Sequence, residues 1–128
     1  MDISEVSEPI TAAKSDLSGS SFAGLSLRAS KFNDVAMQDA SFDNINMSAA
    51  SFHRTNLARA RVMNAMMPGA AFQDVNLSGA VFDDVNLACA TFQNVNLSGV
   101  AISDCDLANL RIDGVLVTDL FAAYRKNV

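Results

Sequence analysis

An apolar residue recurs at every fifth position of this chain from Leu17 to Val117. The run contains 21 consecutive apolar centres without a change of register. The residue two positions before each centre is also small or apolar, and the other three positions are mostly polar. Neither the helical period of 3.6 residues nor the strand period of 2 fits this spacing. We therefore expect a chain that runs straight, turns a corner and repeats, which describes a solenoid.

A second rhythm, of ten residues, indicates the number of sides in each coil. Phenylalanine occupies alternate centres with one gap, at Phe22, Phe32, Phe42, Phe52, Phe72, Phe82 and Phe92. If like residues stack on like in successive coils, the number of sides is even, and two sides enclose no core. Four sides and about 20 residues per coil are the simplest solution. One column of stacked rings would then contain Phe32, Phe52, Phe72 and Phe92.

The coil at residues 60–67 departs from the packing rule of its neighbours. Elsewhere a bulky centre follows a small residue, and the reverse, which keeps the core volume constant. Val62 follows only Ala60, however, and Met67 follows only Ala65. One hypothesis is that this underfilled coil is locally distorted or dented. The other is that a methionine repacks the gap, because methionine is adaptable. The methionines of this coil are Met63, Met66 and Met67.

Charged residues at matching positions of successive coils are the candidate partner-binding sites. A basic patch near the underfilled coil comprises Arg54, Arg59 and Arg61. An acidic corner nearer the C-terminus comprises Asp83, Asp84, Asp104 and Asp106. The acidic corner is either a solvated face or an imitation of DNA phosphates. An alternating ladder of Asp34, Arg54 and Asp74 is expected to mark the register of the coils rather than a site.

The pattern divides the chain into three parts. Residues 1–14 form an N-terminal cap or a disordered lead, residues 15–117 form the β-helix, and residues 118–128 form a short α-helix. Leu120, Phe121 and Tyr124 share one face of that helix. This face either covers the last coil or contacts a second copy of the chain in a homodimer.

Glycine and asparagine recur at the expected corners. Gly19, Gly69, Gly79 and Gly99 share one position of the cycle, which suits a corner whose backbone angles other residues tolerate poorly. Asparagine precedes a Leu or Met centre at Asn46, Asn56, Asn76, Asn86 and Asn96. We expect these side chains to form hydrogen bonds between coils.

Residues that could carry catalysis or hold a metal are few. His53 is the only histidine, and its expected stacking neighbours, Asn33 and Gln73, offer no carboxylate to orient it as a base. Cys89 is expected to point outward and Cys105 inward, so we expect no disulfide and no metal ligation. No glycine-rich phosphate loop is present in the sequence. We therefore expect no catalytic residues, no metal and no cofactor.

Composition narrows the setting in which the chain works. The formal net charge of −5 argues against direct nucleic-acid binding. No apolar run approaches the 18 or so residues of a membrane span, and the acidic N-terminus lacks the features of a secretory signal. We expect a cytoplasmic protein that does not enter a membrane.

The repeats carry a family resemblance. Segments such as those beginning at Ala70 (AAFQD), Val75 (VNLSG) and Ala80 (AVFDD) resemble the A(D/N)LXX unit of pentapeptide-repeat proteins. The resemblance covers about four-fifths of the chain. It implies an all-β fold, a right-handed quadrilateral β-helix of about five coils. It also implies a non-enzymatic protein and favours a bacterial one, since the best understood members bind bacterial type II topoisomerases by imitating DNA.

Two classes of function remain open. The first is a rigid interaction module whose partner is another protein of unknown identity. The second is a DNA mimic that binds a bacterial type II topoisomerase, as in quinolone resistance. A mimic predicts extended acidic faces, whereas here the acidic residues gather in the C-terminal half and basic residues interrupt the middle. That distribution favours the interaction module.

Overall fold

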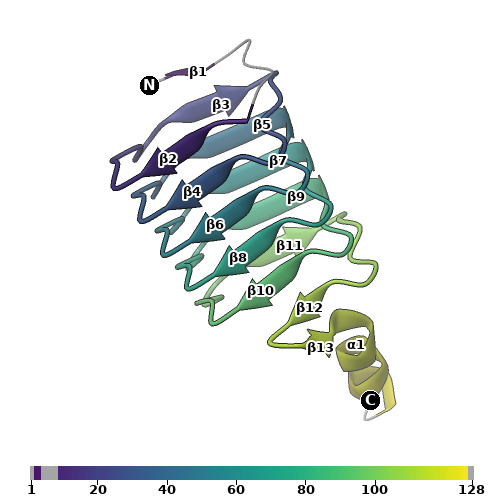
Figure 1. Ribbon diagram of the computed structural model, residues 1–128. Helices are drawn as coiled ribbons and strands as arrows, with labels where there is room; N and C mark the ends of the chain where they lie inside the picture. Colours follow the sequence, from purple (N-terminus) through teal and green to yellow (C-terminus); the bar gives the residue numbers. More distant parts are fainter. Residues whose placement is uncertain (1, 4–8, 127–128) are drawn as a thin grey trace.

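The strands of this protein form two β-sheets, parallel except for the last strand pair, that run along one rod, with the two chain ends at opposite ends of the rod (Figure 1). The computed structural model describes residues 2–3 and 9–126. The six-stranded sheet contains, in spatial order, β1 (Asp2–Ile3), β3 (Ser21–Ala23), β5 (Ser41–Asn46), β7 (Arg61–Met66), β9 (Val81–Asn86) and β11 (Ala101–Ser103). The seven-stranded sheet contains β2 (Thr11–Ala13), β4 (Lys31–Asn33), β6 (Ser51–His53), β8 (Ala71–Gln73), β10 (Thr91–Gln93), β12 (Arg111–Ile112) and β13 (Val115–Leu116). The helix α1 (Val117–Lys126) comes directly after β13.

Successive coils are offset by 20 residues, as the ten-residue rhythm predicts. Phe32 pairs with Phe52, Phe52 with Phe72, and Phe72 with Phe92. The two remaining sides carry isolated parallel bridges with the same offset, such as Asn56 to Asn76. The four-sided coil of 20 residues is therefore confirmed.

Two aromatic columns lie between these walls and form part of the core, together with buried leucine, methionine, valine and alanine side chains. Rings in the column of Phe32, Phe52, Phe72 and Phe92 lie parallel, with centroids 4.7–4.9 Å apart. In the other sheet, the rings of Phe22 and Phe42 stack at 4.8 Å. This spacing equals the distance between paired strands, so backbone pairing and ring stacking reinforce each other.

The second column is interrupted at Val62, which sits between Phe42 and Phe82. A cavity of about 10 Å³ lies in this coil, and Val62, Ala60 and Met67 are among its lining residues. The packing deficit is therefore real but small. The predicted distortion of the backbone is wrong, because β7 pairs along its length with both β5 and β9. Met67 is buried, whereas Met66 is 48% exposed and does not fill the gap.

The corners place many side chains other than glycine in the left-handed region. Gly19, Gly69, Gly79 and Gly99 have φ values of 68–72°, as a glycine corner requires. Sixteen other described residues also have positive φ, so these corners are not restricted to glycine and many hold a residue in a strained conformation. Backbone bonds between coils hold the strained residues in place: the amide of Asp34 donates to His53 (2.9 Å) and that of Arg54 to Gln73 (3.1 Å).

The asparagine row works within each coil rather than between coils. The Oδ1 atom of Asn76 accepts the amide of Ser78 at 2.9 Å, and Asn56 accepts the amide of Ala58 at 3.0 Å. Asn46, Asn86 and Asn96 make the same bond to the residue two positions later. The prediction that these asparagine side chains form hydrogen bonds between coils is therefore wrong. Each asparagine closes a local turn instead.

The two ends of the rod differ from the repeat. The predicted cap or disordered lead at residues 1–14 falls partly outside the described residues; within it, Thr11–Ala13 forms β2 and pairs with β4. At the other end, the chain continues from β12 into the antiparallel strand β13 and then into α1. The helix carries Asp119 in its first turn and Arg125 and Lys126 in its last, which suits its dipole.

Candidate interaction surfaces

The three arginines of the predicted basic patch do not act as one cluster. Arg54 and Arg59 occupy two successive corners of one coil, and Arg61 lies on β7. Arg59 donates from Nε and Nη2 to the two carboxylate oxygens of Asp39, at 2.9 and 3.1 Å. This contact raises the pKa of Arg59 and lowers the pKa of Asp39. The charge of Arg59 is thus balanced from the preceding coil.

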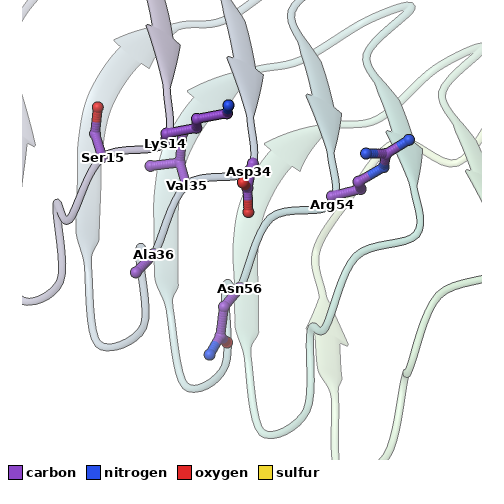
Figure 2. A pocket seen from close by; sticks show the side chains of 7 residues that line it. All are labelled: Lys14, Ser15, Asp34, Val35, Ala36, Arg54 and Asn56. Carbon is purple, nitrogen blue, oxygen red and sulfur yellow. The ribbon is translucent and has the colours of Figure 1, made fainter.

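Arg54 borders a shallow groove of about 440 Å³ on the side of the rod (Figure 2). Its lining residues are Lys14, Ser15, Asp34, Val35, Ala36, Arg54 and Asn56. The groove opens beside Ala36, because the same position in the other coils carries Asp or Asn. Sequence analysis missed this groove, and the alanine among acids and amides was the available signal.

The alternating ladder stacks as predicted, but its charges do not pair. Figure 2 shows the side chain of Arg54 extending away from Asp34. Among residues 9–126, no ion pair joins Arg54 to Asp34 or to Asp74. Asp74 instead approaches His53, and it accepts a hydrogen bond from the side-chain amide of Asn94.

His53 has a carboxylate neighbour that sequence analysis did not expect. It pairs with Asn33 and Gln73 along the sheet, as predicted, but its Nε2 atom lies 3.5 Å from Oδ2 of Asp74. The prediction that no carboxylate lies near His53 is therefore wrong. Both side chains are more than a third exposed, so this contact lies at the surface of the rod.

The acidic corner is built from two stacked residues and two that serve the local structure. Asp84 and Asp104 occupy the same corner of successive coils, with φ values of 57° and 53°. Asp83 accepts a long hydrogen bond of 3.4 Å from the hydroxyl of Ser103. Asp106 closes its own turn by accepting the amide of Ala108 at 3.0 Å. One coil earlier the corner residue is asparagine, so the stacked acidic pair spans only two coils.

Five of the six large apolar side chains described as exposed lie at the C-terminal end of the rod. A cavity of about 260 Å³ opens between the last coil and α1. It is lined by Phe92, Leu97, Ile102, Leu107, Leu110, Ile112, Val117, Leu120 and Phe121. Ile102, Val115, Leu120, Phe121 and Tyr124 are 41–70% exposed. We call these five side chains the apolar end.

The helix face predicted from sequence belongs to this apolar end. Leu120 and Phe121 line the cavity without closing it, and Tyr124 lies further out. Their contact with a second copy stays a prediction. Sequence analysis missed Ile102 and Val115, because both obey the five-residue pattern that elsewhere means burial. The signal was their position, close to the point where the pattern stops.

The described parts of the chain contain neither a metal-ligand cluster nor a membrane-spanning helix. No three His, Cys, Asp or Glu side chains within residues 2–3 and 9–126 gather as a metal would need. In the same ranges, no helix has the length and apolar character to cross a bilayer. Cys89 is exposed and Cys105 partly buried, and both are free thiols.

Four-sided coils of five-residue units also define a known protein family. The family model described as "Pentapeptide repeats" matches eight copies, over residues 13–48, 30–67 and 67–104. This chain belongs to the pentapeptide-repeat family. Its architecture is the right-handed quadrilateral β-helix of about five turns that the resemblance implies. Pentapeptide-repeat proteins are generally structural or interaction modules.

A solved structure of another pentapeptide-repeat protein supports the fold of this chain. A pentapeptide repeat protein from the thylakoid lumen of Arabidopsis thaliana is 25% identical, with a TM-score of 0.74 over 86% of this chain and 75% of that one. Rfr23 from the cyanobacterium Cyanothece 51142 is 16% identical, with a TM-score of 0.49 over 82% and 86% of the two chains.

A third match is the plasmid-mediated fluoroquinolone resistance protein QnrB1. It is 15% identical, with a TM-score of 0.27 over 94% of this chain and 97% of that one. This likeness carries no argument about the present protein. Curated proteins contain no match to the sequence.

Proposed function

We propose that this pentapeptide-repeat protein is a rigid, non-enzymatic module that binds another protein through its apolar end. The observation that supports this is the open cavity of about 260 Å³ beside five exposed apolar side chains. Monomeric soluble proteins rarely leave large contiguous apolar patches exposed, and such patches mark interaction sites. A partner that covers them removes apolar area from water, which is the main driving force of association.

The rest of the rod suits the role of a support. Each coil is bonded to the next through backbone amides on all four sides, and stacked aromatic rings and aliphatic side chains pack the interior. Such a body changes little on binding, so the cost of ordering it is small. We also propose a cytoplasmic location, which the two free thiols support. The lumenal relative means that family membership does not decide the compartment.

Site-specific cross-linking in the source cells tests the proposal. Tyr124 is replaced by a photo-reactive phenylalanine analogue in the full chain, and Gln93, exposed on β10, is replaced likewise as the control. We expect a discrete cross-linked product from position 124 that is absent from position 93. The same products from both positions, or none from position 124, would refute docking at the apolar end.

The alternative function is a DNA mimic that binds a bacterial type II topoisomerase. The stacking of Asp84 and Asp104 on successive coils supports it, because carboxylates about 4.8 Å apart present a short row of negative charge. A gyrase supercoiling assay across protein concentrations tests it. A mimic inhibits supercoiling, and the double substitution Asp84→Asn and Asp104→Asn weakens that inhibition. No effect on supercoiling would exclude this alternative.

A further inference from the structure

The six-stranded sheet ends at β11 with one edge uncovered. In the neighbouring sheet, the antiparallel strand β13 closes the edge of β12. Beyond β11 the next strand would fall at about residues 121–123, but this part of the chain belongs to α1. Figure 1 shows α1 beside β13 at the end of the rod, rather than alongside β11. The edge of β11 therefore has no strand from the described part of its own chain.

The backbone of this edge presents unpaired hydrogen-bonding groups at the positions that, in earlier coils, bond to the coil that follows. In earlier coils of the same sheet, the carbonyl of Ala80 accepts the amide of Ala101, and the amide of Gly24 donates to the next coil. The equivalent groups at the last coil are the carbonyl of Val100 and the amide of Asp104. Within residues 9–126, no backbone hydrogen bond reaches either group. Exposed edges of this kind template the pairing of another strand.

The side chains of the same edge leave an apolar space. Ile102 continues the inward row of Phe82 and pairs with it. Because no residue stacks on its outer side, Ile102 is 41% exposed and lines the cavity with Leu120 and Phe121. An added strand would place one side chain directly over Ile102, since inward residues of paired strands lie about 4.8 Å apart.

We propose that the edge of β11 is a strand-addition site for an extended segment of another protein. The segment pairs in parallel with β11 and places one aliphatic or aromatic side chain over Ile102, inside the cavity. A strand fits better than a helix, because only extended backbone satisfies the carbonyl of Val100 and the amide of Asp104 together. The site rests on the proposed function and specifies the form of the partner.

A peptide copied from β5 provides a defined probe. The segment from Ala40 to Asn46 (ASFDNIN) already occupies this sheet, with Phe42 in the inward row. The amide of its second residue, Ser41, faces the preceding coil, where it donates to the carbonyl of Ser20 at 2.9 Å. On β11 the same amide would meet the carbonyl of Val100. A fluorescent version of this peptide is titrated into the full-length protein, and anisotropy reports binding.

Backbone methylation of the probe separates strand pairing from apolar contact. Methylation at the Ser41 amide removes a donor that faces β11 and should weaken binding about tenfold or more. Methylation at the Phe42 amide, which faces away, should have little effect. Equal binding of both methylated peptides would overturn strand addition but leave docking at the apolar end intact.

Variants of the protein complete the test. Ile102→Asp places a charge in the cavity and should abolish binding, whereas Ala101→Asp places the same charge on the outer face of β11 and should preserve it. Circular dichroism checks that both variants fold. A protein that binds none of the peptides overturns the inference. So does a protein whose edge is occupied by a second copy, detected as a dimer in sedimentation that Ile102→Asp dissociates. In that second outcome the apolar end docks a second copy instead of another protein, which counts against the proposed function as well, whereas failure of the peptides to bind without a dimer counts against strand addition alone.

Discussion

Val62→Phe should stabilise this protein, because it completes the interrupted aromatic column. The substitution adds four buried carbon atoms at about 0.8 kcal/mol each, and two ring contacts, with Phe42 and Phe82, at about 1 kcal/mol each. The cavity of about 10 Å³ holds only part of the new ring, so strain and lost side-chain freedom cost about 3 kcal/mol. A net stabilisation of about 2 kcal/mol remains, which we expect as a higher urea midpoint with an unchanged slope.

The converse substitution provides the control for this prediction. Phe42→Val opens an equivalent gap one coil earlier and should destabilise by a comparable amount. Combining it with Val62→Phe moves the gap without enlarging it, so the double variant should unfold close to the wild-type midpoint. If Val62→Phe destabilises the protein while Phe42→Val behaves as expected, the coil is already filled and the column argument is wrong.

Three further predictions concern the surface of the rod. Asn76→Ala removes the bond that closes its turn and should cost about 1 kcal/mol in urea unfolding, whereas Asn76→Asp keeps the acceptor and should cost less. Arg59 lowers the pKa of Asp39 from its ordinary value of 3.8, so the stability that this contact provides is present above that pH and is lost as the pH falls through the lowered pKa. Asp39→Asn should therefore flatten the acid limb of a melting-temperature profile, and an unchanged limb would count against the contact. Burial raises the pKa of the Cys105 thiol, so iodoacetamide should label the exposed Cys89 first, and mass spectrometry of native protein at neutral pH should find one label rather than two.

The columns of the core could be predicted because each position of the repeat reports the same environment several times. Phe32 and Phe52 share a register 20 residues apart, and four sides are the simplest even number that stacks like residues while enclosing a core. The packing deficit at Val62 was equally visible, since its neighbours in the sequence do not restore the lost volume. In both cases a local pattern translates directly into a contact, because a solenoid coil touches only the coils beside it.

The corners were harder to predict, because the hydrophobic pattern of the sequence reports burial and not backbone dihedral angles. Asp34 and Arg54 adopt positive φ because backbone hydrogen bonds to the next coil hold them there. These bonds do not depend on the side chain, so the residue type does not predict them. The break in the asparagine row at Met66 has a local cause that the sequence does contain. Pro68 has no amide proton, so an asparagine at position 66 would have no donor to accept two residues later.

The surfaces were the least predictable part of the chain. Arg59 stacks on Asp39 and pairs with it. Arg54 stacks on Asp34 in the same way without an ion pair, so side-chain direction decides which stacked charges meet. The exposure of Ile102 depends on which segment of the chain lies next to it in space, and the five-residue pattern contains no information about where the helix lies once the pattern stops. Sequence periodicity therefore describes the interior of a repeat protein better than its ends.

The 20-residue offset between neighbouring coils separates the size of this molecule from its architecture. Duplicating or deleting one whole coil would carry every inward residue onto an equivalent neighbour and would leave both terminal surfaces chemically unchanged. The distance between those surfaces would change by about 4.8 Å for each coil. Duplication of a coil within such a gene thus changes the length of the rod and leaves its docking end the same. A lineage can in this way adapt one docking end to partners that require rods of different length.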